Sequence, residues 1–110
     1  CTVLLDGLAV KSCSVLALTV EGKSVLTAEG LSKGSALHPI QKAFIELGAP
    51  QCGFCTPGML IAAKGFLDKN PSPIYEETKE ALAGNLCRCT GYQKYVDAVV
   101  EAAKGTFGSL

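Results

Sequence analysis

This sequence lacks what several classes of protein require. Its ten basic residues equal its ten acidic ones, so the charge balance gives no basis for binding nucleic acid or an anionic membrane surface. No apolar run approaches the roughly 18 residues of a membrane-spanning helix, and no segment looks like a signal peptide. The only histidine is His38, which excludes a Rieske-type site with two histidine ligands. We therefore expect a soluble, cytoplasmic chain.

The length of 110 residues suits one compact domain or two very small ones. Hydrophobic residues make up 48% of the sequence, which is enough for a packed core. The first residue is Cys1 and not a methionine. We expect that the protein was processed or that its N-terminal part lies outside this sequence.

Residues 1–30 have the pattern of short strands. Residues 2–5 are apolar and end at an Asp-Gly turn signal. Residues 15–20 and 24–28 are two further strand candidates, separated by a Glu-Gly-Lys turn. Three short strands are near the lower limit for independent stability, so we expect this segment to pack against something else.

From residue 37 the apolar spacing becomes helical. A stripe at i, i+3, i+7 and i+10 indicates a first helix that ends at Gly48. A second helix is expected to begin with Thr56 as its N-cap and Pro57 at its first position. It should end at the proline-rich break that starts at Asn70.

Two more helices are expected towards the C-terminus. Residues 76–83 form a short helix with an acidic start, and the last helix begins at Thr90-Gly91 and ends near Gly105. The aromatic residues on the helical stripes are expected in the core, namely Phe44, Phe66, Tyr92 and Tyr95.

The pattern as a whole predicts an α+β chain. We expect a β-rich segment over residues 1–30, a linker of small and polar residues over 31–36, and a bundle of four helices over 37–110.

Four of the six cysteines form two pairs at expected helix starts. Cys52 and Cys55 precede the second helix, and Cys87 and Cys89 precede the last one. The N-terminus of a helix offers unpaired N–H groups and a partial positive charge, which stabilise anionic sulfur. We therefore expect the four thiols to converge on one site.

Three kinds of site use cysteines at this density. A secreted domain could form disulfides, and four cysteines could bind structural zinc or an iron–sulfur cluster. Zinc ribbons usually pair two C-x2–4-C units, and a C-x-C half is unusual for them. The spacing therefore favours an iron–sulfur cluster, with zinc as the main alternative and disulfides least favoured.

Two longer runs around these cysteines carry a resemblance to a known family. The runs QCGFCTPGM at 51–59 and GNLCRCTGY at 84–92, preceded by LHPIQ at 37–41, resemble the iron–sulfur subunit of the xanthine oxidase, or molybdenum hydroxylase, family. The resemblance implies a four-helix domain with a [2Fe–2S] cluster. Its ligands would be Cys52, Cys55, Cys87 and Cys89.

The start of the chain resembles the second half of the family's plant-type ferredoxin domain. The resemblance implies that Cys1 and Cys13 are the third and fourth ligands of another [2Fe–2S] cluster, with the first two ligands ahead of Cys1. Two thiolates alone cannot hold that cluster. We therefore do not expect residues 1–30 to bind it by themselves.

The same resemblance gives roles to other residues. Gln51 could be an ordinary polar loop residue, but the family's glutamine at this position contacts the pterin of the molybdenum cofactor, and Cys89 would lie beside the same pterin. Arg88 is either a surface residue or a counter-charge that raises the reduction potential of the cluster. His38, next to Pro39 at a helix start, is expected to cap or pack.

The function implied by the resemblance is electron relay. The chain would pass single electrons from a molybdenum cofactor on a large partner subunit towards FAD on another. Hydroxylation of the substrate would belong to the partner, because this chain has no evident nucleophile, general base or substrate pocket. The alternatives are a structural zinc module and a free-standing ferredoxin, which would have no evident need for a helical cluster domain.

Overall fold

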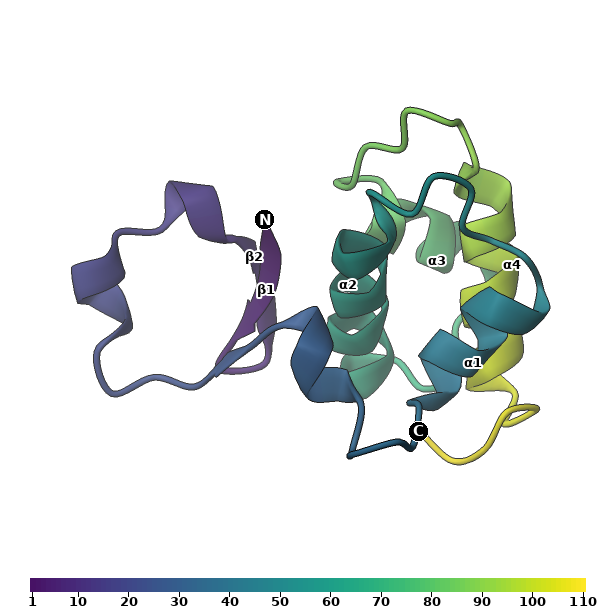
Figure 1. Cartoon of the computed structure of the whole chain (residues 1–110), viewed down its shortest axis with the longest axis horizontal. Coiled ribbons are helices and arrows are strands. Elements are labelled where there is room, and N and C mark those ends of the chain that lie inside the picture. The colour runs from purple at the N-terminus through teal and green to yellow at the C-terminus, as the bar shows by residue number, and fades with distance from the viewer.

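The computed structural model describes all 110 residues, as a small antiparallel sheet beside four helices (Figure 1). Mixed helix and sheet is thus confirmed. No helix is both long and apolar enough to cross a membrane. The strands are β1 (Thr2–Leu5), β2 (Leu8–Lys11) and β3 (Val25–Leu26), and the helices are α1 (Pro39–Glu46), α2 (Thr56–Lys69), α3 (Tyr75–Leu82) and α4 (Tyr92–Ala103).

The sheet is built around a tight hairpin. β1 pairs with β2 in an antiparallel register that closes at Leu5 and Leu8. The two residues between them, Asp6 and Gly7, have φ values of 49° and 84°. Positive φ at both central positions is the requirement of a two-residue type I′ turn, whose twist matches that of the flanking strands. The chain therefore reverses directly after β1.

Two of the expected strands differ from the structure. Residues 15–20 were expected to be extended, but Ala17–Val20 is a short 3₁₀ helix. Of residues 24–28, only Val25–Leu26 form a strand, which pairs with β1. β2 itself was missed. In the sheet order β2-β1-β3, β1 pairs with β2 and β3, and residues 15–20 take no part in the sheet.

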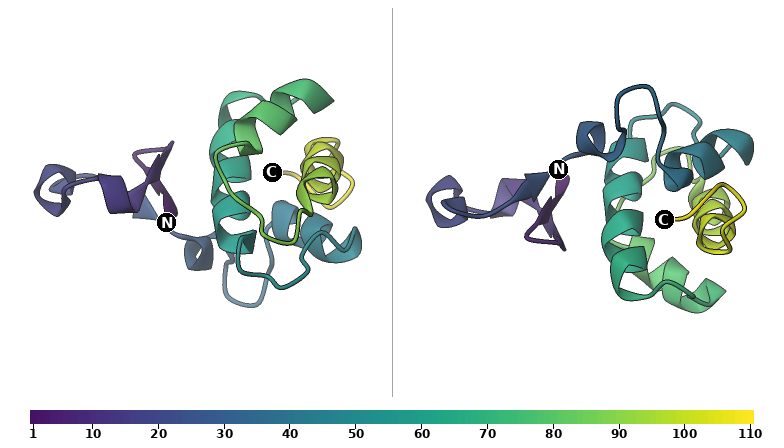
Figure 2. Two further views of the ribbon diagram at one scale, coloured as in Figure 1. Left: turned by 90° about the horizontal axis from the view of Figure 1, so that it is seen from above. Right: turned by 90° about the horizontal axis from the view of Figure 1, so that it is seen from below.

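Helix α2 lies between the sheet and the other helices (Figure 2). A helix that is covered on two sides should be apolar around most of its circumference. Its buried residues are Met59, Leu60, Ile61, Ala62, Ala63, Gly65 and Leu67. Gly65 has no side chain where β1 approaches, since a Cβ there would lie 2.8 Å from the Leu4 Cδ2 atom. Phe66, expected in the core, is half-buried.

The start of α2 differs from the expectation. Cys55 is its N-cap residue, no side chain caps the helix, and Thr56 is already its first helical residue. The Thr56 hydroxyl lies instead 2.9 Å from the hydroxyl of Tyr95 on α4. The partner of the Thr56 hydroxyl is therefore a residue of another helix and not the backbone at the start of α2.

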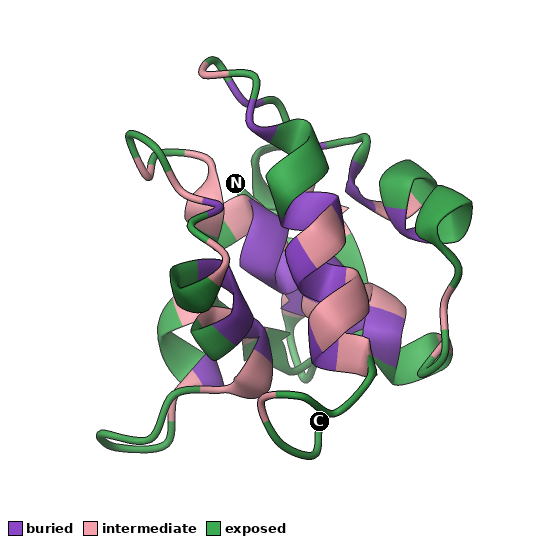
Figure 3. Cartoon of the chain, turned by 90° about the vertical axis from the view of Figure 1, so that its right-hand side faces the viewer, coloured by how far each residue is buried: buried purple, intermediate pink, exposed green.

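The buried residues lie mainly in the helices (Figure 3). Two of the four expected aromatic residues are among them, Phe44 and Tyr95. The rings of Phe44 and Tyr95 meet edge to face, with centroids 5.0 Å apart and an interplanar angle of 73°. Tyr92 was also expected in the core, but its side chain is 39% exposed. Its hydroxyl accepts a hydrogen bond from the Cys87 N–H at 2.8 Å, so the ring lies at the surface of the loop that it supports.

Asn85 connects the sheet to the helical part of the chain. Its buried Oδ1 atom accepts a hydrogen bond from the Thr2 hydroxyl at 2.9 Å, and the Lys11 ammonium donates to the same hydroxyl at 3.0 Å. A Cβ at Gly58 would lie 2.8 Å from Oδ1, so that glycine makes room for the contact. Cys1 and Cys87 each lie within two residues of this hydrogen bond.

Replacing Asn85 by alanine is expected to lower the free energy of unfolding by about 1 kcal/mol, because Thr2 loses its acceptor. A double-mutant cycle with Thr2→Val, followed by urea unfolding, isolates the pair. We expect a coupling energy of roughly 0.5–1.5 kcal/mol. Asn70→Ala is the control, because Asn70 bonds to Glu77 on an exposed surface. Additive effects of Asn85→Ala and Thr2→Val would show that the hydrogen bond between these two side chains does not stabilise the fold.

His38 caps helix α1, as expected. Its Nδ1 atom accepts a hydrogen bond from the Ile40 N–H at 3.2 Å, and the Gln41 side chain accepts from the His38 N–H at 2.8 Å. This reciprocal arrangement is a capping box. The cap requires the neutral imidazole, because a protonated Nδ1 cannot accept a hydrogen bond.

The cap should make stability depend on pH. Burial, together with Lys64 and Lys33 and against Asp68, lowers the pKa of His38. The unfolded chain thus binds the proton at higher pH than the folded one, so the free energy of unfolding is highest above about pH 6.5 and falls as the pH drops below it. In His38→Asn, which keeps a capping side chain, urea unfolding should lose this dependence. An equal fall of the free energy of unfolding at low pH in both proteins would contradict this role of His38.

Candidate metal centre

The two cysteine-containing loops meet where α2 and α4 begin. Cys55 immediately precedes α2, and the loop with Cys87 and Cys89 leads into α4. Gly91 allows the loops to come close, since a Cβ there would lie 3.2 Å from the Gln51 Nε2 atom and 3.6 Å from the Ala49 carbonyl oxygen. The expected convergence of the two loops at helix N-termini is therefore present.

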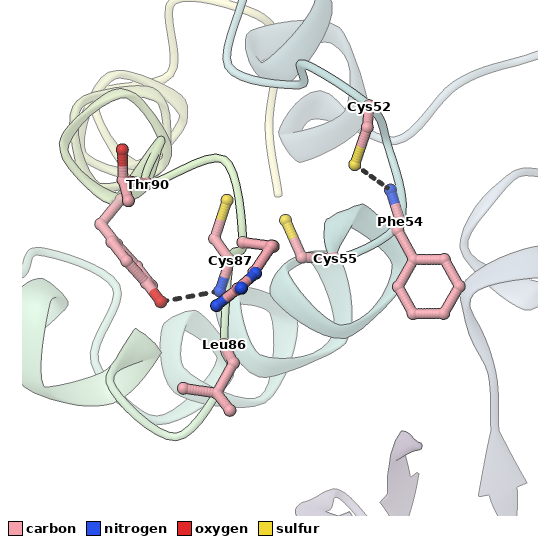
Figure 4. A pocket seen from close by; sticks show the side chains of 8 residues that line it. Cys52, Phe54, Cys55, Leu86, Cys87 and Thr90 are labelled. Atoms are coloured by element: carbon pink, nitrogen blue, oxygen red, sulfur yellow. Dashed lines mark hydrogen bonds between the residues drawn. The ribbon is translucent and has the colours of Figure 1, made fainter.

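Between the loops lies a hollow of about 480 Å³ with mostly apolar walls (Figure 4). Two apolar side chains on it are strongly exposed, Phe54 at 92% and Leu86 at 87%. The residues that line it are Cys52, Phe54, Cys55, Leu86, Cys87, Arg88, Thr90 and Tyr92. Three of the four expected ligands thus share one cavity.

The four thiols are gathered unequally. Cys55 and Cys87 are close enough to affect each other's ionisation, and Cys52 lies on the same hollow. Cys89 does not line it and is half-buried against the core. No three cysteine, histidine, aspartate or glutamate side chains are close enough together to hold a metal ion. As donors, four thiols on two helix-start loops fit an iron–sulfur or zinc site.

Cys87 is the thiol that the surrounding backbone prepares for ionisation. The Gly91 N–H donates to its Sγ atom at 3.4 Å. This hydrogen bond, helped by the Cys55 thiol and the neighbouring backbone, lowers the pKa of Cys87. Burial raises the pKa of Cys55, and the neighbouring Cys87 adds to this rise. Cys87 should therefore lose its proton before Cys55.

In both loops a backbone N–H group donates a hydrogen bond to a cysteine residue. The Phe54 N–H donates to the Cys52 Sγ atom at 3.5 Å, in a turn where Gly53 has φ of 86°. In the other loop the Thr90 N–H donates to the Cys87 carbonyl, and Thr90 has φ of 58°. A β-branched residue in this left-handed region is unusual and costs free energy. Thr90 thus marks a loop that the surrounding structure holds in place.

Tyr95 contributes a hydroxyl that the sequence did not reveal. Its oxygen lies 3.3 Å from the Cys55 Sγ atom and 2.9 Å from the Thr56 Oγ1 atom. Burial and the neighbouring Cys55 thiol raise the pKa of Tyr95 to about 12. From the sequence, Tyr95 was expected only to pack in the core. The available signal was the choice of tyrosine at a core position, since a buried hydroxyl usually has a partner.

Gln51 lies beside the cysteine loops, on the surface. Its side-chain amide donates to the Cys89 carbonyl oxygen at 3.4 Å. The two residues therefore belong to one local arrangement. Next to it is a recess of about 390 Å³ with no hydrophobic lining, formed by Gln51, Thr90, Gly91, Gln93, Lys94 and Asp97.

Cys1 and Cys13 lie elsewhere, at the open end of the β1–β2 hairpin. Both are exposed, and the Ser12 N–H donates to the Cys1 carbonyl at 2.7 Å. All six cysteines are free, so none is joined in a disulfide. The exposed Arg88 lines the hollow, a position compatible with either role considered for it.

Comparison with known proteins gives consistent matches. Residues 27–100 match the family described as "[2Fe-2S] binding domain". The chain is 57% identical over 102 residues to the nicotine 6-hydroxylase small subunit of Paenarthrobacter nicotinovorans, covering 93% of this chain and 61% of that subunit. It is 49% identical to the xanthine dehydrogenase iron-sulfur-binding subunit of Escherichia coli O157:H7, covering 94% and 67%.

Solved structures show the same similarity. Quinoline 2-oxidoreductase from Pseudomonas putida 86 superposes with a TM-score of 0.90 at 47% identity, covering 96% of this chain and 66% of the matched chain. Aldehyde oxidoreductase from Desulfovibrio gigas gives a TM-score of 0.90 at 43% identity, covering 12% of its much longer chain. The chain spans 61% and 67% of the two small subunits named above.

Proposed function

Because this chain belongs to the [2Fe–2S] binding domain family, among the small iron–sulfur subunits of molybdenum hydroxylases, we propose that it is the electron-transfer part of such an enzyme. Cys52, Cys55, Cys87 and Cys89 are the proposed ligands of a [2Fe–2S] cluster. The bound cluster would supply a one-electron carrier between a molybdenum cofactor and FAD on partner subunits. The observation that carries this proposal is the hollow between the two loops, which three of these cysteines line.

The residues around the hollow have definable tasks. The Gly91 N–H and the start of α4 stabilise negative charge on Cys87. Phe54 and Leu86 keep the approach to the sulfurs apolar. Arg88 is the proposed counter-charge, which would favour the reduced state because that state carries one more negative charge.

Gln51 and Cys89 are the proposed contact with the partner's molybdenum cofactor. Both border the surface, and the recess beside Gln51 is lined by polar side chains only. Such a recess offers hydrogen-bond donors and acceptors to a polar pterin. The side chain of Gln51 would orient the pterin, and the loop that carries Cys89 would bring a ligand sulfur next to it.

The larger assembly follows from the same family membership. We propose residues 37–110 as the four-helix cluster domain, residues 31–36 as the linker, and residues 1–30 as part of a ferredoxin-like domain to which Cys1 and Cys13 contribute ligands. The proposed partners are a large molybdenum-cofactor subunit and an FAD-binding subunit.

Metal analysis tests the proposal directly. The chain, produced with iron available and purified without oxygen, should contain about two irons and two acid-labile sulfides at the Cys52, Cys55, Cys87 and Cys89 site. Its visible absorption should bleach on reduction. One zinc per chain without sulfide would overturn the proposal in favour of a structural zinc module.

A further inference from the structure

Tyr95 is held rigidly beside one of the proposed ligands. Its side chain is only 1% exposed. The ring packs edge to face on Phe44 of α1, with centroids 5.0 Å apart. Packing of α4 against α1 therefore holds the ring, and with it the hydroxyl, in the core.

Those partners are two, and the ionisation state of Cys55 decides how the protons are arranged. The Tyr95 oxygen lies 3.3 Å from the Cys55 Sγ atom and 2.9 Å from the Thr56 Oγ1 atom. A cysteine thiol can donate to the tyrosine oxygen, but a thiolate can only accept. Once Cys55 is a thiolate, the Tyr95 hydroxyl keeps its proton and can donate a hydrogen bond to the sulfur. Thr56 is then free to donate to Tyr95.

We propose that Tyr95 is a positioning residue that donates a hydrogen bond to the Cys55 thiolate and raises the reduction potential of the cluster. The inference rests on the proposed function, because it requires Cys55 to be a cluster ligand. Its physical basis is that reduction adds negative charge, part of which resides on the ligand sulfurs. A hydrogen bond to sulfur stabilises the reduced state more than the oxidised one.

Thr56 strengthens the donor. When the threonine hydroxyl donates to the tyrosine oxygen, it polarises the tyrosine O–H, because hydrogen bonds in a chain reinforce one another. The chain of hydrogen bonds runs from Thr56 to Tyr95 to Cys55, and so joins the start of α2 to α4 beside the hollow.

The test is a redox titration of the reconstituted chain, followed by EPR. Tyr95→Phe keeps the ring and removes only the hydroxyl, so it should retain iron and sulfide and show a lower reduction potential. Tyr75→Phe is the matched control, because Tyr75 begins α3 and does not line the hollow. It should titrate like the parent.

Two outcomes separate this inference from the proposed function. A parent chain that binds no cluster overturns the proposed function itself. A Tyr95→Phe chain with full iron and sulfide but the parent's potential overturns the role of Tyr95 alone. If Tyr95→Phe does not fold, Thr56→Val is measured instead. It leaves the ring in place and should lower the potential by a smaller amount, and an unchanged potential there also overturns the inference.

Discussion

A Cys87→Ser chain should contain no [2Fe–2S] cluster at the proposed site. Cys87 is buried, and the Gly91 N–H holds its pKa down, so it is the sulfur best prepared to bind iron as a thiolate. A serine hydroxyl at the same place is a harder ligand that ionises far less readily.

The measurement is iron and acid-labile sulfide per chain. We expect a fall from about two of each to nearly none, with loss of the visible absorption. Cys13→Ser is the matched control, because Cys13 is exposed at the end of the hairpin and does not line the hollow. It should keep the parent's content. Equal losses in both variants, or a Cys87→Ser chain with full iron and sulfide, would contradict the proposed ligand set.

The second large effect is expected on electron transfer in the assembled complex. Cys89→Ser should slow the oxidation of the partner's molybdenum centre, while its reduction by substrate continues at the parent rate. The reason is position: the Cys89 carbonyl accepts a hydrogen bond from Gln51, which lines the polar recess, whereas Cys52, Cys55 and Cys87 line the other hollow. The slowing should be at least the roughly 10- to 100-fold typical for losing an outer-shell partner of a metal site.

Rapid-reaction spectroscopy can follow the two half-reactions separately. A Cys89→Ser complex that has lost the cluster yet reduces its flavin at the parent rate would make this chain a scaffold and not a relay. The comparison is with Glu80→Ala, an exposed change on α3 that should affect neither half-reaction.

Gln51→Ala separates contact with the pterin from cluster binding. Gln51 is not a proposed ligand, so iron and sulfide should stay at the parent level. Loss of hydrogen bonds that a buried interface has already desolvated should weaken the hold on the pterin by roughly 1–3 kcal/mol. Retention of the molybdenum cofactor by the complex measures this. Unchanged retention would place the contact elsewhere.

Much of the helical part could be predicted because its signals are local. Gly48 with φ of 63° ends the turn after α1, Asn70-Pro71 terminates α2, and His38 caps α1. Each signal acts through a residue's own backbone preference or through neighbours within four positions. The cysteine spacing relative to these helix starts is equally local. The sequence therefore predicted that both cysteine pairs stand at helix N-termini.

The strands were harder because pairing is not local. Residues 15–20 are as apolar as a strand, but a strand also needs a partner strand, and no local feature of the sequence specifies that partner. In the folded chain β1 pairs with β2 and β3 instead. The Asp6-Gly7 turn signal was recognised, yet the short, mostly exposed run after it was too weakly patterned to indicate β2.

The sequence by itself determined that there are four helices and, to within about two residues, where they begin and end. It also determined which cysteines stand together and the family to which those motifs belong. Only the tertiary structure decided that Tyr92 lies at the surface, where its hydroxyl accepts a hydrogen bond from the Cys87 N–H. It also decided that the Tyr95 hydroxyl lies within hydrogen-bond distance of the Thr56 hydroxyl and the Cys55 sulfur. The reason is separation along the chain. Residues some 40 positions apart meet only when α2 and α4 pack, and no local preference encodes which polar atoms that packing brings together.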